Sequence, residues 1–314
     1  MKLVLSRKYF TTLLLADQIK KGSIQLNTPI LSLLPNREKE YSRSLQNVNV
    51  LNLATHTSGL PRITIRSVNG SLLSRVLYPW GVYRLLFGYD PYSRYDTTKL
   101  FKDLRSVQLE TKPGRKFSYS NLGVTLLGYV VAHKSKMSYD SLLTKTILDT
   151  LNMNHTWTRL PQSQMQNFAT GHNRLGFRTP RWTFKDDMEG AGALNSTVND
   201  LMKFLSVNLN NDNKYLHDLL GDCQKTYFKE SEHRNIGLAW IKSNSEKTDN
   251  HEIIWHNGGT GGFRSFLGFN KESKVGVVVL SNTSKEVDAL SIDILKQLMK
   301  EKSNPPMDKP LSIK

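Results

Sequence analysis

Four closely spaced strand patterns near the C-terminus constrain the fold of this chain more than any other feature. They are IGLAWIK (236–242), IIWHN (253–257), FRSFLGFN (263–270) and VGVVVLSN (275–282), and KES between the last two is typical of a hairpin turn. A closing helix is expected over about residues 286–301. Because the chain before these strands is mainly helical, the pattern indicates an α+β fold, with an antiparallel sheet flanked by helices and a helical domain beside it.

Helical patterns dominate the chain before residue 235. Leucines and isoleucines predict an amphipathic helix over about residues 9–21, which Gly22 stops. VLNLATHTSGLP predicts a short helix that ends at Gly59 and Pro61. LGVTLLGYVVAHK has helical periodicity, and Ser138 is a candidate cap for the helix that follows it.

We expect these elements to form two intertwined subdomains. Thr197-Val198-Asn199-Asp200 resembles a capping box, with Asp in place of Glu, and opens a further helix. The predicted organisation is the first part of an α/β subdomain (1–60), a mainly helical subdomain (61–190), a return to the α/β subdomain (191–302) and a disordered tail (303–314).

The charge balance is strongly basic, with 43 Lys and Arg against 27 Asp and Glu and a net charge of +16. Nucleic acid or an anionic polymer is one class of partner that such a charge fits. The basic residues are scattered, however, so we favour a generally basic surface and expect no nucleic-acid partner. A single cysteine, Cys223, excludes an intramolecular disulfide. No apolar run has membrane-spanning length, and no secretory leader is expected.

Tyr119-Ser120-Asn121 lies in a predicted loop just before a helix. A Tyr whose hydroxyl faces a lysine can act as a general base, and an Asn two residues later can orient a lysine or a substrate amide. The triplet is also common by chance. By itself it fits a buried Tyr with an Asn helix cap better than a catalytic pair.

The second candidate is His256-Asn257-Gly258-Gly259-Thr260-Gly261-Gly262, where a strand enters a run of four glycines. Glycines permit a close approach of backbones, so a substrate could lie antiparallel to the strand edge. A backbone N–H could then donate to an oxyanion. A phosphate-binding loop is excluded because no Lys-Ser/Thr pair and no helix follow. A plain glycine-rich hairpin turn stays open as the alternative.

The combination resembles the serine beta-lactamase and penicillin-binding-protein family, and most of all its class C-like branch of D-alanyl-D-alanine carboxypeptidases, D-aminopeptidases and esterases. Tyr119-Ser120-Asn121 matches the Tyr-x-Asn motif of that family, and His256-Asn257-Gly258 matches the His-x-Gly form of its third motif. The similarity covers nearly the whole chain, in the stretches FTTLLLADQIKKGSIQLNTPI, LATHTSGLP, PGRKFSYSNLGVTLLGYVV, LNMNHTW, EGAGALNSTVNDLMKFL and WHNGGTGGFRSFLGF. It implies a site between the sheet and the helical domain.

The first motif of the family, Ser-x-x-Lys, departs from this pattern. Its serine attacks a carbonyl and becomes acylated, while lysine and tyrosine transfer the proton. Lys8 aligns with the motif lysine, but Leu5 occupies the position of the nucleophile. Ser6 has the wrong spacing, because on a helix it would lie about 100° away from the productive face. The first two sheet strands of the family are also expected to be missing.

Two explanations for Leu5 compete: a pseudoenzyme that binds peptides or peptidoglycan without cleaving them, and a damaged or misread gene. Codons permitted for Met1–Phe10, read two bases later, give Glu-Ile-Gly-Ser-Ile-Thr-Lys-Val-Phe, which restores Ser-x-x-Lys in front of FTTLLLA. We favour this frameshift hypothesis, and with it a truncated enzyme that is inactive as written. The coding DNA tests it, because codons that cannot yield this second frame would exclude it.

The resemblance also implies the remaining roles and partners. Lys8 and Tyr119 would transfer protons, Asn121 would position the substrate, His256 would contribute electrostatically, and Gly259 N–H beside Gly258 would be an oxyanion donor. Asn257, Thr260 and Gly261 would contact the substrate, which is a D-amino-acid peptide, a beta-lactam or an ester. The family uses no metal and no cofactor, and its members usually work in the periplasm or outside the cell. The oligomeric state stays open.

Overall fold

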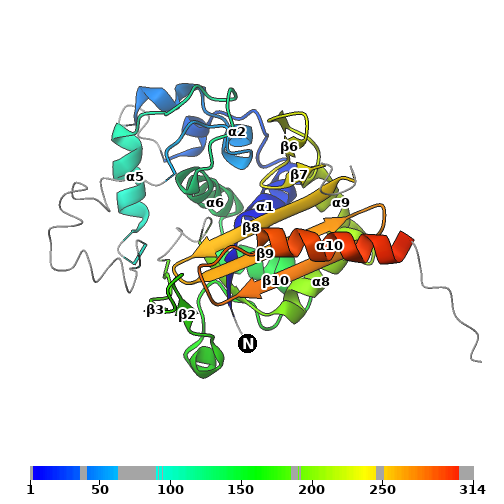
Figure 1. Cartoon of the computed structure of the whole chain (residues 1–314). Coiled ribbons are helices and arrows are strands. Elements are labelled where there is room, and N and C mark those ends of the chain that lie inside the picture. Colours follow the sequence, from blue (N-terminus) through cyan, green and yellow to red (C-terminus); the bar gives the residue numbers. More distant parts are fainter. Residues whose placement is uncertain are drawn as a thin grey trace, which may run out of the picture.

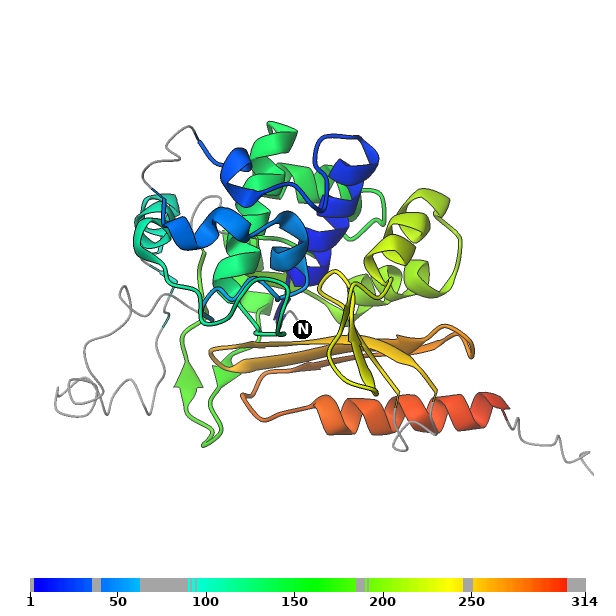
Figure 2. The same cartoon turned by 90° about the horizontal axis from the view of Figure 1, so that it is seen from above.

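The computed structural model describes residues 3–35, 41–62, 90, 92–93, 95–184, 190, 192–244 and 251–303. The elements form three layers, with helices above an antiparallel sheet and one helix below it (Figure 2). The α+β architecture expected from the sequence is therefore confirmed. The predicted tail beyond residue 303, and most of residues 63–94 of the predicted helical subdomain, lie outside the described residues.

The main sheet has six strands in the order β10-β9-β8-β7-β6-β5, all antiparallel to their neighbours (Figure 1). Its longer strands, β8 (Ile253–Thr260), β9 (Phe263–Asn270) and β10 (Val275–Ser281), follow the sequence patterns closely. β8 runs three residues past the predicted IIWHN and includes the first two glycines. The shorter strands are β5 (Phe228–Lys229), β6 (Arg234–Ile236) and β7 (Ile241–Ser243).

The prediction of a single strand over 236–242 is wrong, because a tight turn separates the end of β6 from the start of β7. Gly237 N donates to Trp240 O across this turn (2.8 Å), and Ala239 has a left-handed φ of +57°. Ala239 N also donates to Ala54 O (2.8 Å). This bond ties the turn to the end of the short helix α2 (Val50–Ala54), so a contact distant in sequence overrides the local strand pattern.

Each face of the sheet has its own apolar cover. Helix α10 (Asp288–Ser303) packs on one face, where Leu295 and Met299 meet Ile253 and Val277. The opposite face carries the main core, to which α1 (Lys8–Lys20), α6 (Asn121–Ser135), α8 (Val198–Leu209) and α9 (Lys214–Cys223) contribute. The other helical and extended segments are η1 (Ile30–Leu33), η3 (Arg43–Asn47), α5 (Thr97–Ser106), α7 (Tyr139–Leu143), a π-helical turn (Thr144–Leu148), η6 (Gln162–Asn167), β2 (Gly171–His172) and β3 (Arg178–Thr179).

Helix α1 is buried on all sides. The predicted helix is therefore present, but the prediction that it is amphipathic is wrong. Every residue from Lys8 to Gln18 is buried, including the polar Thr11 and Thr12. Thr11 Oγ1 donates to Gly190 O (2.6 Å) and Thr12 Oγ1 to Leu238 O (2.9 Å), so neighbouring backbone carbonyls satisfy both hydroxyls. The helix therefore lies in the centre of the core and begins beside the sheet.

The chain enters α1 from a short strand. β1 (Leu3–Ser6) pairs with β4 (Ala193–Ser196), and Leu5 lies opposite Leu194. Arg7 is the N-cap, so the first helical residue is Lys8. The helical rotation argued for Ser6 is therefore wrong, because Ser6 ends the strand and is not part of the helix.

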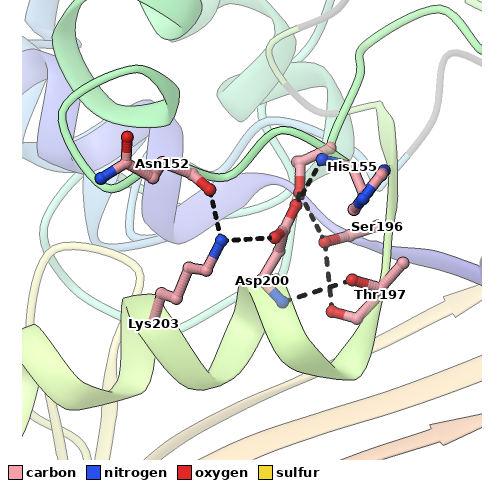
Figure 3. A network of polar contacts seen from close by, with 7 residues as sticks. Asn152, His155, Ser196, Thr197, Asp200 and Lys203 are labelled. Atoms are coloured by element: carbon pink, nitrogen blue, oxygen red, sulfur yellow. Dashed lines mark hydrogen bonds and ion pairs between the residues drawn. The ribbon is translucent and has the colours of Figure 1, made fainter.

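The expected capping box at the start of α8 forms only in part. Thr197 Oγ1 accepts a hydrogen bond from Asp200 N (3.3 Å), as predicted for the cap. The carboxylate of Asp200 does not reach back to the cap, because His155 N (2.7 Å), Thr156 Oγ1 (2.8 Å) and Lys203 Nζ (3.2 Å) all donate to it (Figure 3). Asp200 therefore joins the start of α8 to His155 and Thr156.

Candidate functional site

Lys8, Tyr119 and His256 meet at the start of α1, although they come from three distant parts of the chain. The Lys8 ammonium lies 4.6 Å from the centroid of the Tyr119 ring, and the Arg62 guanidinium lies 5.5 Å from the same centroid. The positive charge of Lys8 also lowers the pKa of His256. Lys8 therefore lies over the ring of Tyr119, which is a cation–π arrangement.

His56 is a fourth member of this group, and none of the three motifs contains it. Its ring lies 4.6 Å from the Tyr119 ring, centroid to centroid, and its Nδ1 accepts a hydrogen bond from Ser120 N (3.2 Å). The proton of the neutral ring is therefore on Nε2. His56 belongs to the stretch LATHTSGLP that carries the family resemblance. Its backbone has a left-handed φ of +57°, which cannot be read from the sequence.

Both buried histidines are neutral at physiological pH. Burial, followed by the charge of Lys8, lowers the pKa of His256 from 6.5 to about 3. The same two causes lower the pKa of His56 well below its ordinary value. His256 Nδ1 bonds to Asn257 O, which places its proton on Nδ1 and leaves the lone pair on Nε2. The expected electrostatic contribution of His256 is thus that of a dipole, not that of a cation.

These two histidines should make the fold sensitive to mild acid. Each has a lower pKa when folded than when unfolded, so the unfolded state binds more protons below pH 6.5 and stability falls as the pH falls. Between pH 6 and pH 5 we expect the two histidines to lower the free energy of unfolding by about 2 kcal/mol. Urea unfolding at each pH measures it. His256→Gln should remove about half of the loss and the exposed control His133→Gln none; an unchanged loss in His256→Gln would contradict the assignment.

The second half of β8 is paired on one side only among the described strands. β7 pairs with β8 up to Trp255, whereas β9 pairs with β8 through to Thr260. The backbone of Gly258 and Gly259 therefore borders the site as an available strand edge. A side chain at 259 would collide with Arg264, because an added Cβ would lie 1.6 Å from Arg264 Nη1.

The other predicted contact residues bond within the protein. Asn121 Nδ2 donates to Tyr92 OH (3.1 Å), and Asn257 Nδ2 donates to Asp288 Oδ2 (2.5 Å) at the start of α10. Gly261 O accepts a hydrogen bond from Thr179 Oγ1, and Thr260 O accepts one from Gly262 N (2.7 Å). Asn257 thus points toward α10, and Thr260 and Gly261 form the turn that ends β8.

Leu5, the position at which the family resemblance places the nucleophile, lies in the strand that leads into α1. β1, which contains Leu5, contacts β8 and β9. Two bulky polar residues follow it into the core: Arg7 is 0% exposed and Tyr9 is 1% exposed. The Tyr9 hydroxyl has no hydrogen-bond partner among the described residues. Burial raises the pKa of Tyr9 far above its usual range, so the hydroxyl stays protonated.

A pocket of about 180 Å³ opens beside the site, where β7 separates from β8. Its wall is mainly apolar and aromatic, and it shares Tyr119 and His256 with the group around Lys8. The lining residues are His56, Phe117, Tyr119, Arg234, Ile236, Ala239, Trp240, Ile241, Trp255, His256 and Asn257. No acidic side chain is among them. Arg234 belongs to none of the sequence motifs, and Phe117, in the stretch PGRKFSYSN, was assigned no role; only the tertiary fold brings the two together at the site.

Two kinds of feature are absent from the described ranges. Within them, no three His, Cys, Asp or Glu side chains are placed to hold a metal ion together. No helix in that part of the chain is long and apolar enough to cross a membrane.

Comparison with known proteins gives one family. The family model described as Beta-lactamase matches residues 6–298. A solved structure titled "A class C beta-lactamase" superposes with a TM-score of 0.78 at 22% identity, covering 96% of this chain and 82% of that one. At that identity, the match concerns the fold.

In the curated relatives, the match covers a smaller share of the relative's own length. "Protein flp" of Staphylococcus aureus (strain COL) is 25% identical over 295 residues, which are 89% of this chain and 52% of that protein. "Beta-lactamase" of Providencia stuartii is 27% identical over 205 residues, covering 65% and 45%. The chain thus spans about half the length of the curated relatives it matches.

Proposed function

This chain belongs to the beta-lactamase family, and on that premise we propose that it retains the substrate-binding and proton-transfer groups of a serine acyl-transfer site but lacks the nucleophile. The reaction of the intact site would be transfer of an acyl group from a D-amino-acid peptide, beta-lactam or ester to serine, followed by hydrolysis. Lys8 and Tyr119 would move the proton, and Gly259 N–H would stabilise the oxyanion.

The convergence of Lys8, Tyr119 and His256 beside the strand edge of β8 is the observation that carries this proposal. These residues come from the positions that match the three family motifs, and Lys8 reaches the Tyr119 ring at 4.6 Å. Leu5 stands three residues before Lys8, where the family has serine. A leucine has no lone pair with which to attack a carbonyl, so the assembled site has no nucleophile of its own.

The burial of Arg7 and Tyr9 supports the hypothesis that Met1–Phe10 is a misread segment. An arginine at 0% exposure and a phenol hydroxyl without a described partner both carry a desolvation cost. The shifted reading has Thr in place of Arg7 and Val in place of Tyr9, which suit a buried position. The second candidate, a selected pseudoenzyme that binds peptides, would have to tolerate both costs for the sake of its function.

The test is covalent labelling of the chain as written. After incubation with a fluorophosphonate or a penicillin, intact-mass spectrometry should show no stable adduct, because the nucleophile position holds no serine that could form the acyl bond. Peptide mapping would locate any label. An adduct on Ser6 would overturn the proposal, since Ser6 would then be the working nucleophile.

A further inference from the structure

The turn of the β2–β3 hairpin exposes two apolar side chains between two arginines. Its five residues, Arg174-Leu175-Gly176-Phe177-Arg178, are all exposed, and we call them the hairpin tip. Leu175 is 73% exposed, more than any other large hydrophobic side chain in the described part of the chain, and Phe177 is 42% exposed. Apolar side chains that are exposed together, with a polar rim, mark an interaction surface.

We propose that the hairpin tip inserts into the interface of an anionic membrane. Leu175 and Phe177 would enter the boundary between headgroups and acyl chains, and Arg174 and Arg178 would bind lipid phosphates. Arginine suits this position, because its apolar stem lies along the acyl chains while its guanidinium binds a phosphate with two donors. The inference is independent of the proposed function, since no residue of the group around Lys8 takes part.

The backbone of the hairpin tip suits an apolar environment. Asn173 Oδ1 accepts hydrogen bonds from Leu175 N (2.9 Å) and Phe177 N (3.0 Å), and Asn173 O accepts one from Gly176 N (3.1 Å). Gly176 permits this turn with a φ of +89°. Unsatisfied N–H groups are what excludes an ordinary loop from a membrane. Three consecutive N–H groups of the tip bond inside the turn, so insertion does not cost them their partners.

The hairpin is fixed to the end of the main sheet where β8 ends (Figure 1). His172 N donates to Gly262 O (3.2 Å) and to Asn282 O (2.9 Å), and Ser284 N donates to His172 O (2.9 Å). A tip held in this way loses little conformational entropy when it inserts. Insertion would also bring the glycine-rich end of β8 close to the membrane surface.

The charges around the hairpin tip match an anionic surface. Arg174 Nη2 meets Glu286 Oε1 at 3.3 Å, and the two side chains are 67% and 53% exposed. An ion pair so exposed contributes little stability, so a lipid phosphate can replace the carboxylate. Arg264 Nη2 meets the same Glu286 oxygen at 2.8 Å, so Glu286 keeps a partner when Arg174 turns to the membrane. The net charge of +16 adds attraction at longer range.

Co-sedimentation of the whole chain with sucrose-loaded vesicles tests the proposal. One set of vesicles is phosphatidylcholine alone, and the other contains about 30% phosphatidylglycerol, both at about 0.1 M salt. The partition coefficient should be at least about tenfold higher on the anionic vesicles. Absence of binding to them, as expected if the tip instead docks on a protein, would overturn the proposal.

The apolar part of the tip is tested by Leu175→Ser combined with Phe177→Ser. This pair should lower the partition coefficient on anionic vesicles at least about tenfold, because the apolar contact is lost. The matched control, Leu290→Ser with Leu298→Ser, removes two exposed leucines of α10 and should change it less than about twofold. An equal loss in both pairs, or no loss in the first, would show that charge alone attracts the protein.

The arginines are tested by Arg174→Gln combined with Arg178→Gln. The partition coefficient on anionic vesicles should fall about twentyfold, since each arginine near an anionic surface contributes about fivefold. Arg43→Gln with Lys214→Gln removes the same charge from exposed positions elsewhere and should cost less than about threefold. Equal losses in the two pairs would contradict a specific role for the tip.

Insertion itself is measured with a fluorophore that responds to its environment. Cys223 is the only cysteine and is buried, so a nitrobenzoxadiazole label on Leu175→Cys reacts at the tip. With anionic vesicles its emission should shift to the blue and rise at least about twofold, as the label leaves water. The same label on Leu290→Cys should show neither change. Unchanged emission at position 175 in vesicle-bound protein would overturn the proposal, whatever the other variants show.

Discussion

Restoring the shifted reading of the first ten residues should convert an unreactive chain into one that takes up about one acyl group per molecule. The variant combines Lys2→Glu, Leu3→Ile, Val4→Gly, Leu5→Ser, Ser6→Ile, Arg7→Thr and Tyr9→Val, and keeps Lys8. Its new serine stands three residues before Lys8, so a helix extended back by one turn would place both on one face. Intact-mass spectrometry after fluorophosphonate treatment measures the gain, and peptide mapping should find the label at position 5.

The single variant Leu5→Ser is the matched control for this experiment. It adds the hydroxyl but keeps Arg7 as the N-cap and leaves position 5 in β1, so the new serine is not in the first turn of α1. We expect labelling at least about a hundredfold slower than in the full replacement, because a nucleophile displaced by about 1 Å already loses that much. A full replacement that folds, as judged by circular dichroism, but takes no label would contradict the damaged-enzyme hypothesis and favour the binding protein.

Replacing Gly59 by alanine should destabilise the fold by about 3 kcal/mol or more. Gly59 has a φ of +73°, and an added Cβ would lie 2.0 Å from the backbone carbonyl oxygen of Thr111. Neither atom belongs to a flexible side chain, so relief requires a shift of the loop that holds His56 beside Tyr119. Overpacking of this kind costs about 1–3 kcal/mol, and the left-handed backbone adds about 1–2 kcal/mol. Urea unfolding measures the loss.

Gly22 provides a control with the same backbone conformation. Its φ is also +73°, but an added Cβ would have no neighbour within 4 Å. Gly22→Ala should therefore lose only the conformational part, about 1–2 kcal/mol. The difference between the two variants isolates the collision with Thr111. Equal losses would show that the contact at Gly59 relaxes freely, and the close approach would then not hold the His56 loop in place.

Local sequence patterns were sufficient for the long strands of the main sheet. The β9 pattern gave its bounds to the residue, because hydrophobic strand residues were bordered by a glycine turn and by KES. The same local information failed at 236–242, where a turn is held by a hydrogen bond to Ala54, far away in the chain. It also failed for α1. The threonines of this helix are buried because their hydroxyl groups donate hydrogen bonds to backbone carbonyls of distant segments.

The candidate site was predictable only as far as short motifs reach. Tyr119 and His256 stood out by their neighbours, and Lys8 and Leu5 by comparison with the family pattern. Arg234 was not predictable, because no residue near it in sequence signals a role. Phe117 stands two residues before Tyr119, but its contact with Arg234 depends on how β6 packs beside the loop before α6. The direction of Asn257 toward Asp288 likewise depends on the placement of α10.

β10 is the last strand of its sheet in the part of the chain that the structure describes. Five of its seven residues are Val or Leu, and none of the seven carries a charge that would discourage another strand from pairing there. The repulsion between copies therefore depends on the net charge of +16. Because added salt screens that charge over a distance of about 10 Å, the colloidal behaviour of this protein should be governed by ionic strength, with dilute salt keeping copies apart and concentrated salt bringing their sheets together.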